Sequence, residues 1–457
     1  MSGAVPTVAV DGELQKLLDE ALARHGVVGA SLAVLRDGKV AAAASGMLNV
    51  DSGVRVRPES PFQIGSISKL FTATLAMQLV EEGRLDLDAP VRRYLPDFAL
   101  ADAAAASRIT TRQLLNHSSG MEGDFFPQDD PWGASADSYV RKMALLPQLH
   151  DVGAYMCYCN SGFVLAGRVI EVLAGKPWQQ LVMERICTPL GMRQAFADPR
   201  EALRYLSAVG HMADPASPSR LSVSPLTYLP LSMAAAGSVL SMSAADLLRF
   251  VAAHLRGGVS EAGRRVLSEA STAAMRASQM RLPALRAGFD RMGLGWFIGK
   301  LADEEIVGHD GACAGQFAYT LSVPRHDFAY ALLTNSPSAA MADELRSTLL
   351  RPIGVTAQDP PPQPPPDWTP LRYVGTYENL AARLLIAGRP GGLALKIVPR
   401  QPGLVQHQQA ELVPHSPDCF DILSDNPMLQ GRVTFVGETD GRAQFAAVGV
   451  RMARRVS

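Results

Sequence analysis

Residues 65–83 read GSISKLFTATLAMQLVEEG, a stretch that indicates both a fold and a chemistry. Its apolar side chains recur at helical spacing, namely at Ile67, Leu70, Phe71, Leu75 and Leu79. Gly83 then favours the end of the helix. The stretch therefore predicts a helix that begins at Ser66 and carries Lys69 one turn later on the same face.

A serine and a lysine in this arrangement can act as a nucleophile and its base. The hydroxyl of Ser66 is a weak nucleophile unless a neighbouring group takes its proton, and a lysine withdrawn from water can be neutral enough to do so. Taken alone the pair is weak support, because a serine at a helix start is usually only a cap. Two elements farther along the chain add weight to it.

The second element is Tyr158-Cys159-Asn160, which leads into an expected helix, SGFVLAGRVIEVL. The phenol of Tyr158 can accept or relay the serine proton, and the amide of Asn160 can hold the lysine or a substrate carbonyl. The alternative is a buried tyrosine and a helix-capping asparagine. Beside Ser66 and Lys69 we favour the catalytic interpretation.

The third element is His309-Asp310-Gly311, which we expect just before a strand. Small residues here let a substrate backbone lie close. A histidine can titrate near neutrality, so His309 is expected to exchange protons with the leaving group or the incoming nucleophile. A purely structural histidine is the alternative.

Strand signals lie at both ends of the region before residue 357. Residues 13–26 predict an amphipathic helix ending at Gly26, and Asp37-Gly38 predicts the turn of a hairpin. Further strands are expected in GLGWFIGK, FAYTLSVP and FAYALLTN. The expected class is therefore α/β, with an antiparallel sheet completed from both ends, flanking helices and an inserted all-helical subdomain.

The proline-rich stretch AQDPPPQPPPDWTP marks a boundary, because repeated prolines favour a stiff extended spacer. We predict a catalytic domain over residues 1–356, a linker over 357–370 and a β domain over 371–457. Short β-type segments follow the linker: YVGTYEN, ARLLIAG, LALKIVP, RVTFVGE and AQFAAVGVRMA. They predict a small antiparallel barrel or sandwich.

With these elements in hand, the chain resembles the serine β-lactamase and penicillin-binding-protein superfamily over roughly residues 12–350. It is nearest to class C β-lactamases, D-aminopeptidases and related esterases, and GRLDLDAPVRRYLP, ITTRQLLNHSSGM and AAAGSVLSMSAADLLRF add to the likeness. The resemblance implies a Ser66 acyl-enzyme with an oxyanion hole from the backbone N–H groups of Ser66 and Ala312 beside Gly311, and substrate contact at Gly237. His309 replaces the lysine of class C β-lactamases, which argues against an efficient β-lactamase or wall transpeptidase.

The histidine variant and the added β domain look most like penicillin-binding-protein-type thioesterases, stand-alone cyclases with a lipocalin-like second domain. That likeness implies a peptidyl thioester substrate, which a carrier protein can present, and release of a nonribosomal peptide by macrolactam formation. It also implies substrate recognition by an arginine near the end of the second domain, which we match to Arg451. Arg454 and Arg455 are alternatives, and all three can equally be surface charges.

The loop EGDFFPQDDPWGASADSY is a second candidate for substrate contact. Phe125, Phe126 and Trp132 can wall a pocket or form a satellite core with equal ease. His117, in LLNHSSG, is interpreted as structural because its segment matches a scaffold region of the resembled family.

Composition excludes several other classes of function. The 457 residues carry a net charge of −1, so we expect neither nucleic acid nor membrane as a partner. The five scattered cysteines suit reduced thiols, and the N-terminal stretch has no signal-peptide pattern, so we expect a cytoplasmic protein. Metal and nucleotide motifs are missing, so no metal or other cofactor is expected.

Two other functions stay open. One is a hydrolase of the same fold, namely a carboxylesterase, a D-aminopeptidase or a weak class C β-lactamase-like enzyme, in which water resolves the acyl-enzyme. The other is a penicillin-recognising sensor that acylates once or not at all. The cyclase is favoured because a chain without an export signal should not crosslink cell wall outside the membrane.

Overall fold

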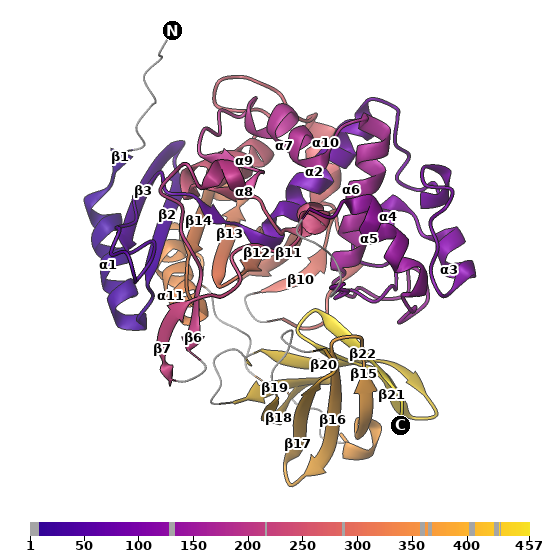
Figure 1. Ribbon diagram of the computed structural model, residues 1–457. Coiled ribbons are helices and arrows are strands. Elements are labelled where there is room, and N and C mark those ends of the chain that lie inside the picture. The colour runs from indigo at the N-terminus through magenta and orange to yellow at the C-terminus, as the bar shows by residue number, and fades with distance from the viewer. Residues whose placement is uncertain are drawn as a thin grey trace.

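The computed structural model describes residues 9–127, 133–214, 217–285, 288–356, 362–363, 368–401, 407–424, 429 and 431–457. A large sheet with helices on both faces stands beside a helical region, and a β-barrel lies beneath them (Figure 1). This arrangement confirms the predicted class, including the sheet flanked by helices.

The large sheet has nine strands in the order β1-β3-β2-β14-β13-β12-β11-β10-β9, so both ends of the region supply strands as predicted. Neighbours are antiparallel except the β1–β3 pair. The hairpin turn at Asp37 and Gly38 has positive φ at both residues, as its sequence indicates. The strands are β1 (Ala9–Val10), β2 (Gly29–Arg36), β3 (Lys39–Gly46), β9 (Met280–Arg281), β10 (Phe289–Met292), β11 (Phe297–Leu301), β12 (Glu304–Cys313), β13 (Gln316–Val323) and β14 (Phe328–Thr334).

Helices cover both faces of this sheet. α1 (Gly12–His25) begins at the Asp11 cap and ends at Gly26 in the left-handed conformation, as predicted. It packs with α11 (Ala339–Leu350) on one face, and α9 (Ala244–Leu255) packs on the other. The sheet is therefore the middle layer of three.

The helical region surrounds α2 (Ser68–Glu81), which is buried along nearly its whole length. A 3-10 turn, η1 (Gly65–Ile67), precedes it, so Ser66 lies in that turn and the α-helix begins two residues later than expected. A second 3-10 turn, η5 (Leu231–Ala236), packs beside α2. The other helices are α3 (Ala103–Arg108), α4 (Thr111–Leu115), α5 (Ala136–Lys142), α6 (Asn160–Ala174), α7 (Trp178–Val182), α8 (Pro199–Ala202) and α10 (Glu269–Arg276).

Two small sheets complete this part of the chain. One has the order β4-β8-β5, and the other is the β6–β7 hairpin. Their strands are β4 (Phe62–Gln63), β5 (Ala195–Phe196), β6 (His211–Asp214), β7 (Ser217–Val223) and β8 (Ser241–Met242). β4 leads directly into the turn that holds Ser66.

The C-terminal strands form a closed antiparallel barrel in consecutive order, which decides between the barrel and the sandwich. Tyr377, Phe420 and Phe435 are among the side chains that fill its interior. The predicted segment AQFAAVGVRMA divides into two strands at Gly449, and two strands were not predicted, β18 and β19. The strands are β15 (Gly375–Glu378), β16 (Ala382–Arg389), β17 (Gly392–Pro399), β18 (Gln408–Ser416), β19 (Cys419–Leu423), β20 (Arg432–Thr439), β21 (Arg442–Val448) and β22 (Arg451–Arg455).

The predicted linker, residues 357–370, falls largely outside the described residues, so the domain boundaries stay predictions. Within the described part of the chain, no helix combines the length and apolar character needed to cross a membrane. All five cysteines are buried and unpaired.

Candidate active site

Two glycines let the turn that holds Ser66 pack tightly against its neighbours. A Cβ atom on Gly311 of β12 would lie 2.0 Å from the carbonyl oxygen of Ile64. A Cβ atom on Gly237, where φ is +124°, would lie 2.4 Å from the carbonyl oxygen of Gly65. The backbone of Ser66 is therefore held between β12 and the turn after η5, at positions where only glycine fits.

Lys69 is buried and directs its ammonium nitrogen at Ser66. Its Nζ lies 3.2 Å from Ser66 Oγ, 2.7 Å from Asn160 Oδ1 and 2.6 Å from the carbonyl oxygen of Ala236. Burial, followed by the positive charge of Arg451, lowers the pKa of Lys69 to about 7. A substantial fraction of Lys69 is therefore neutral near pH 7, and its two acceptors leave the nitrogen lone pair for the serine proton.

Tyr158 lies beside both groups, with its ring centroid 4.8 Å from Lys69 Nζ. Burial raises its pKa, while a hydrogen bond with Ser66 opposes that rise. Its ring stacks on His117 at 4.4 Å between centroids, and His117 Nδ1 accepts a hydrogen bond from the backbone N–H of Cys159. The phenol is thus held in its protonated form next to Ser66, and the contacts of His117 agree with a structural role for that residue.

His309 lies inside strand β12, not before a strand as expected. Its Nδ1 lies 2.6 Å from the carbonyl oxygen of Asp310, which can only accept, so Nδ1 carries the proton. Burial, followed by the charge of Lys69, lowers the pKa of His309 to about 3. The expectation that His309 titrates near neutrality is therefore wrong. The ring is neutral, and its Nε2 has no partner among the described residues and is a hydrogen-bond acceptor at the cavity.

Asp124 is a site residue that the sequence did not predict. Its Oδ1 accepts a hydrogen bond from Asn160 Nδ2 at 2.7 Å, and its Oδ2 accepts one from Arg451 Nε at 2.5 Å. Asn160 in turn contacts Lys69. No motif marks Asp124, and the one available signal is its place in the loop expected to wall the pocket.

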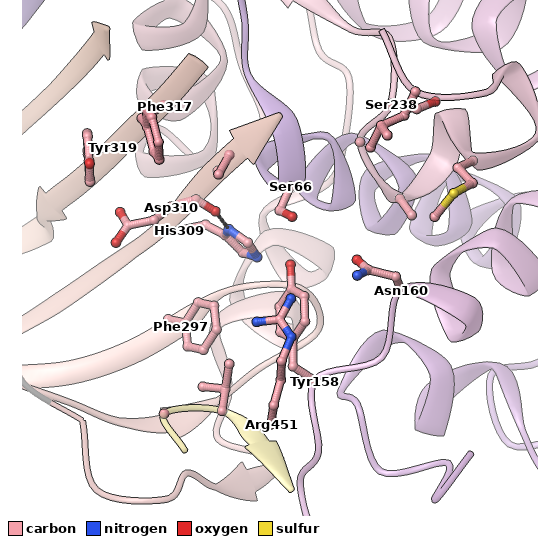
Figure 2. A pocket seen from close by; sticks show the side chains of 18 of the residues that line it. Ser66, Tyr158, Asn160, Ser238, Phe297, His309, Asp310, Phe317, Tyr319 and Arg451 are labelled. Atoms are coloured by element: carbon pink, nitrogen blue, oxygen red, sulfur yellow. Dashed lines mark hydrogen bonds between the residues drawn. The ribbon is translucent and has the colours of Figure 1, made fainter. Parts of the chain in front are cut away.

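Ser66, Tyr158, Asn160, His309 and Arg451 line a cavity of about 530 Å³, within the range of small-molecule sites. Figure 2 shows Ser66, Tyr158, Asn160 and His309 facing a common space, with Arg451 extending into it from the barrel strand. The lining residues are Ser66, Phe126, Tyr158, Asn160, Leu229, Met233, Ala236, Gly237, Ser238, Leu285, Phe289, Phe297, His309, Asp310, Gly311, Ala312, Phe317, Tyr319, Val448, Gly449, Val450 and Arg451.

The remaining predicted site residues differ in outcome. Phe126 lines the cavity, whereas the ring of Phe125 packs against Tyr139 at 5.3 Å between centroids. Trp132 lies outside the described residues. Arg455 is hydrogen-bonded within the barrel, to carbonyl oxygens including those of Ala443 and Val374. Arg454 lies with it at a separate cavity, so Arg451 is the arginine at this one.

The barrel supplies one wall of the cavity, through residues 448–451. The barrel also binds the loop between β9 and β10, because Arg432 Nη1 donates to the carbonyl oxygen of Leu285 at 3.0 Å. Next to it, the backbone N–H of Ala284 donates to Thr434 Oγ1 at 3.1 Å. Nucleophile and wall therefore come from segments far apart in the chain.

Known proteins share this architecture. The sequence profile of the Beta-lactamase family matches residues 14–354. Penicillin-binding protein 4 of Amycolatopsis lactamdurans is 39% identical over 376 residues, which cover 80% of this chain and 97% of that protein. A crystal structure of SurE with D-Leu has a TM-score of 0.76 and 29% identity, covering 97% of this chain and 99% of that one. The structure of D-amino acid amidase from Ochrobactrum anthropi SV3, complexed with L-phenylalanine, has a TM-score of 0.59 and 28% identity. The match covers 71% of this chain and 90% of that one.

Proposed function

Because the chain belongs to the beta-lactamase and penicillin-binding-protein family and is a serine acyl-transfer enzyme, we propose that it is a stand-alone peptidyl thioesterase that cyclises its product. In this function Ser66 takes the peptidyl group from a thioester, and the amine at the other end of the same peptide displaces it. The product is a head-to-tail macrolactam, here of a nonribosomal peptide, and a carrier protein presents the thioester.

The observation that carries the proposal is that the barrel forms part of the acyl-transfer cavity, at residues 448–451. The likeness to SurE spans nearly the whole chain, barrel included, and that protein was solved with D-Leu. A D-residue at the acylating end of the substrate is consistent with that likeness.

The first half-reaction follows from the contacts of Lys69. Neutral Lys69 takes the proton of Ser66 as Ser66 Oγ bonds to the thioester carbon. The backbone N–H groups of Ser66 and Ala312 are the proposed donors to the resulting oxyanion. When the carbon–sulfur bond breaks, the thiolate takes the proton from Lys69, and the peptide remains as an ester of Ser66.

The second half-reaction needs an amine that loses one proton. His309 Nε2 faces the cavity as an acceptor, so it can orient an amine N–H. As the amine attacks the ester, its proton passes to Lys69 through Tyr158 and then to Ser66 Oγ, which leaves as the hydroxyl. An amide bond forms, and the ester bond to Ser66 breaks.

The test uses an N-acetylcysteamine thioester of a peptide with a free N-terminal amine and a D-residue at the acylating end. Mass spectrometry should detect cyclic product, 18 Da lighter than the linear acid by loss of one water, and none with Ser66→Ala. The matched substrate has the L-epimer at the acylating end and should cyclise more slowly. Linear acid as the sole product from both epimers would overturn the cyclase.

A hydrolase is the second candidate, favoured by the likeness to D-amino acid amidase from Ochrobactrum anthropi SV3. In that case water in place of the amine resolves the Ser66 ester. The same assay distinguishes the two, because a hydrolase gives linear acid, and an added external amine does not divert the acyl group.

A further inference from the structure

Asp124 joins two parts of the protein that are far apart in the sequence. It lies in the loop between α4 and α5. Its Oδ1 accepts from Asn160 of the helical region at 2.7 Å, and Arg451 of the barrel donates to Oδ2 through Nε, with a longer contact of 3.5 Å from Nη2 to Oδ1. Its side chain is 15% exposed, against 47% for Arg451, so the carboxylate is the inner member of the pair. We propose that Asp124 is a positioning residue that orients the Asn160 amide toward the Lys69 base, and that Arg451 of the barrel tunes this base together with Asp124.

The orientation of the Asn160 amide follows from hydrogen-bond chemistry. A carboxylate has no proton to donate, so the Asn160 group that faces Asp124 must be the NH2 group. The amide oxygen then faces Lys69 Nζ, at 2.7 Å. An amide at position 124 could not serve both neighbours equally, because Asn160 and Arg451 both donate to it and an amide has one acceptor end.

This orientation matters for proton transfer. A neutral lysine has two N–H bonds and one lone pair, and Asn160 Oδ1 and the carbonyl oxygen of Ala236 take the two N–H bonds. The third direction, toward Ser66 Oγ, is left for the lone pair. If the amide of Asn160 were flipped, its NH2 group would face Lys69 Nζ, and two hydrogen-bond donors would point at each other.

The groups that face Lys69 also set its charge. They are Asp124, Arg451, Tyr158, Cys159, Cys313, His117 and His309. Burial raises the pKa of Cys159 and Cys313 to about 12 and lowers that of His309 to about 3, with His117 also lowered. The charged neighbours near neutral pH are therefore Asp124 and Arg451, which raise and lower the pKa of Lys69 respectively.

This inference rests on acylation of Ser66, the first half of the proposed function, and not on the nucleophile that ends it. Its first test is the pKa of Lys69, which is measured by an NMR titration of [13Cε]lysine-labelled protein. The Lys69 signal is assigned as the one that is missing from Lys69→Arg. The chain has only seven lysines, so the spectrum is sparse. We expect Asp124→Asn to lower this pKa by about one unit and Arg451→Gln to raise it by about one unit.

The second measurement is the pH profile of acylation, followed as p-nitrophenol release from p-nitrophenyl butyrate. Asp124→Asn should move the acid limb to lower pH and reduce the plateau of kcat/KM by roughly 10- to 100-fold, because the amide is no longer held. Arg451→Gln should move the limb to higher pH. Asp124→Glu, which keeps the charge, should recover part of the plateau.

Matched controls are Asp440→Asn and Arg442→Gln, which are exposed in the β20–β21 hairpin of the same barrel and should change neither readout. Thermal unfolding checks that each variant folds. The inference is overturned if the two site variants shift the Lys69 pKa in the same direction or leave it in place. If the shifts occur and no cyclic peptide forms, the positioning role stands and the cyclase falls.

Discussion

The guanidinium of Arg451 lies over the ring of Tyr158, with 5.2 Å between the guanidinium carbon and the ring centroid. The backbone supports this contact, because the N–H of Tyr158 donates to the carbonyl oxygen of Val450 at 2.9 Å. A cation over an aromatic ring contributes about 0.5–2 kcal/mol. The barrel therefore contacts the catalytic region at a residue of the site itself.

Replacing Tyr158 by phenylalanine should separate the contribution of the hydroxyl group from that of the ring. The contacts with His117 and Arg451 involve the ring and stay in place. We expect the free energy of unfolding to change little, while acylation slows by about 10²–10³-fold because Ser66 loses its hydrogen bond with the phenol. Stopped-flow acylation and thermal unfolding provide the two readouts.

The control for this change is Tyr155→Phe, since Tyr155 packs against Phe445 away from the cavity. It should acylate at the wild-type rate. Equal losses in the two variants would contradict a role for the Tyr158 hydroxyl.

Acylation should require the neutral form of Lys69. The pKa of this buried amine is about 7, so protonation below pH 7 removes the base and kcat/KM should fall tenfold per unit toward acid. Lys69→Ala should abolish this limb and lower the plateau by about 10²–10⁴-fold. Lys176→Ala, which removes an exposed lysine paired with Glu184, is the matched control. A rate that stays level between pH 5 and 8, in a wild-type enzyme limited by acylation, would exclude this base.

Gly311→Ala should disturb the nucleophile turn. The added Cβ meets the carbonyl oxygen of Ile64 at 2.0 Å, and backbone atoms cannot move aside cheaply. We expect a loss of about 1–3 kcal/mol in the free energy of unfolding and little remaining activity. Gly12→Ala, which adds a Cβ with no atom within 4 Å, should leave both unchanged. Denaturant titration measures the difference, and a fully active Gly311→Ala enzyme would contradict the close packing.

Glu122 should make stability depend on pH. Its carboxyl is buried near Leu380 of the barrel region, and burial raises its pKa to about 7 from an unfolded value of 4.5. The folded protein holds this proton where the unfolded chain has lost it, so stability should fall as pH rises from 4.5 to 7 and stay lowered above 7. The size is on the order of 3 kcal/mol at most.

Glu122→Gln should remove this dependence and stabilise the protein at pH 8, as measured by denaturant unfolding across pH. The exposed Glu261→Gln is the control. A Glu122→Gln protein with the wild-type slope against pH would show that another group carries the effect.

Much of the fold was predictable because its signals are local. The hairpin at Asp37-Gly38 and the helix ended by Gly26 each depend on backbone preferences of a few residues. Strands β18 and β19 were missed because polar residues interrupt their apolar pattern, and Pro414 lies where their register shifts. The segment AQFAAVGVRMA was predicted as one strand but forms β21 and β22. Gly449 in its middle was the available signal for a turn between them.

The candidate site was predictable only where motifs mark it. Ser66, Lys69, Tyr158, Asn160 and His309 were singled out by residue type and spacing, and the structure brings all of them except Lys69 to one cavity, with buried Lys69 in contact with Ser66. The neutral state of His309 depends on burial, which no spacing reveals. Phe126 lines the cavity and Phe125 does not because of side-chain direction in an irregular loop. Asp124 can be recognised as a site residue only from its contacts with Asn160 and Arg451.

The shared cavity wall also bears on how such a protein diverges. Wall residues 448–451 lie far in the sequence from the turn that holds Ser66, so substitutions at Val448 and Val450 can reshape the cavity without changing that turn, whereas Arg451 also contacts Asp124 and Tyr158. Selection on the shape of the cavity and selection on the chemistry then act on different stretches of the gene, and they meet at Arg451.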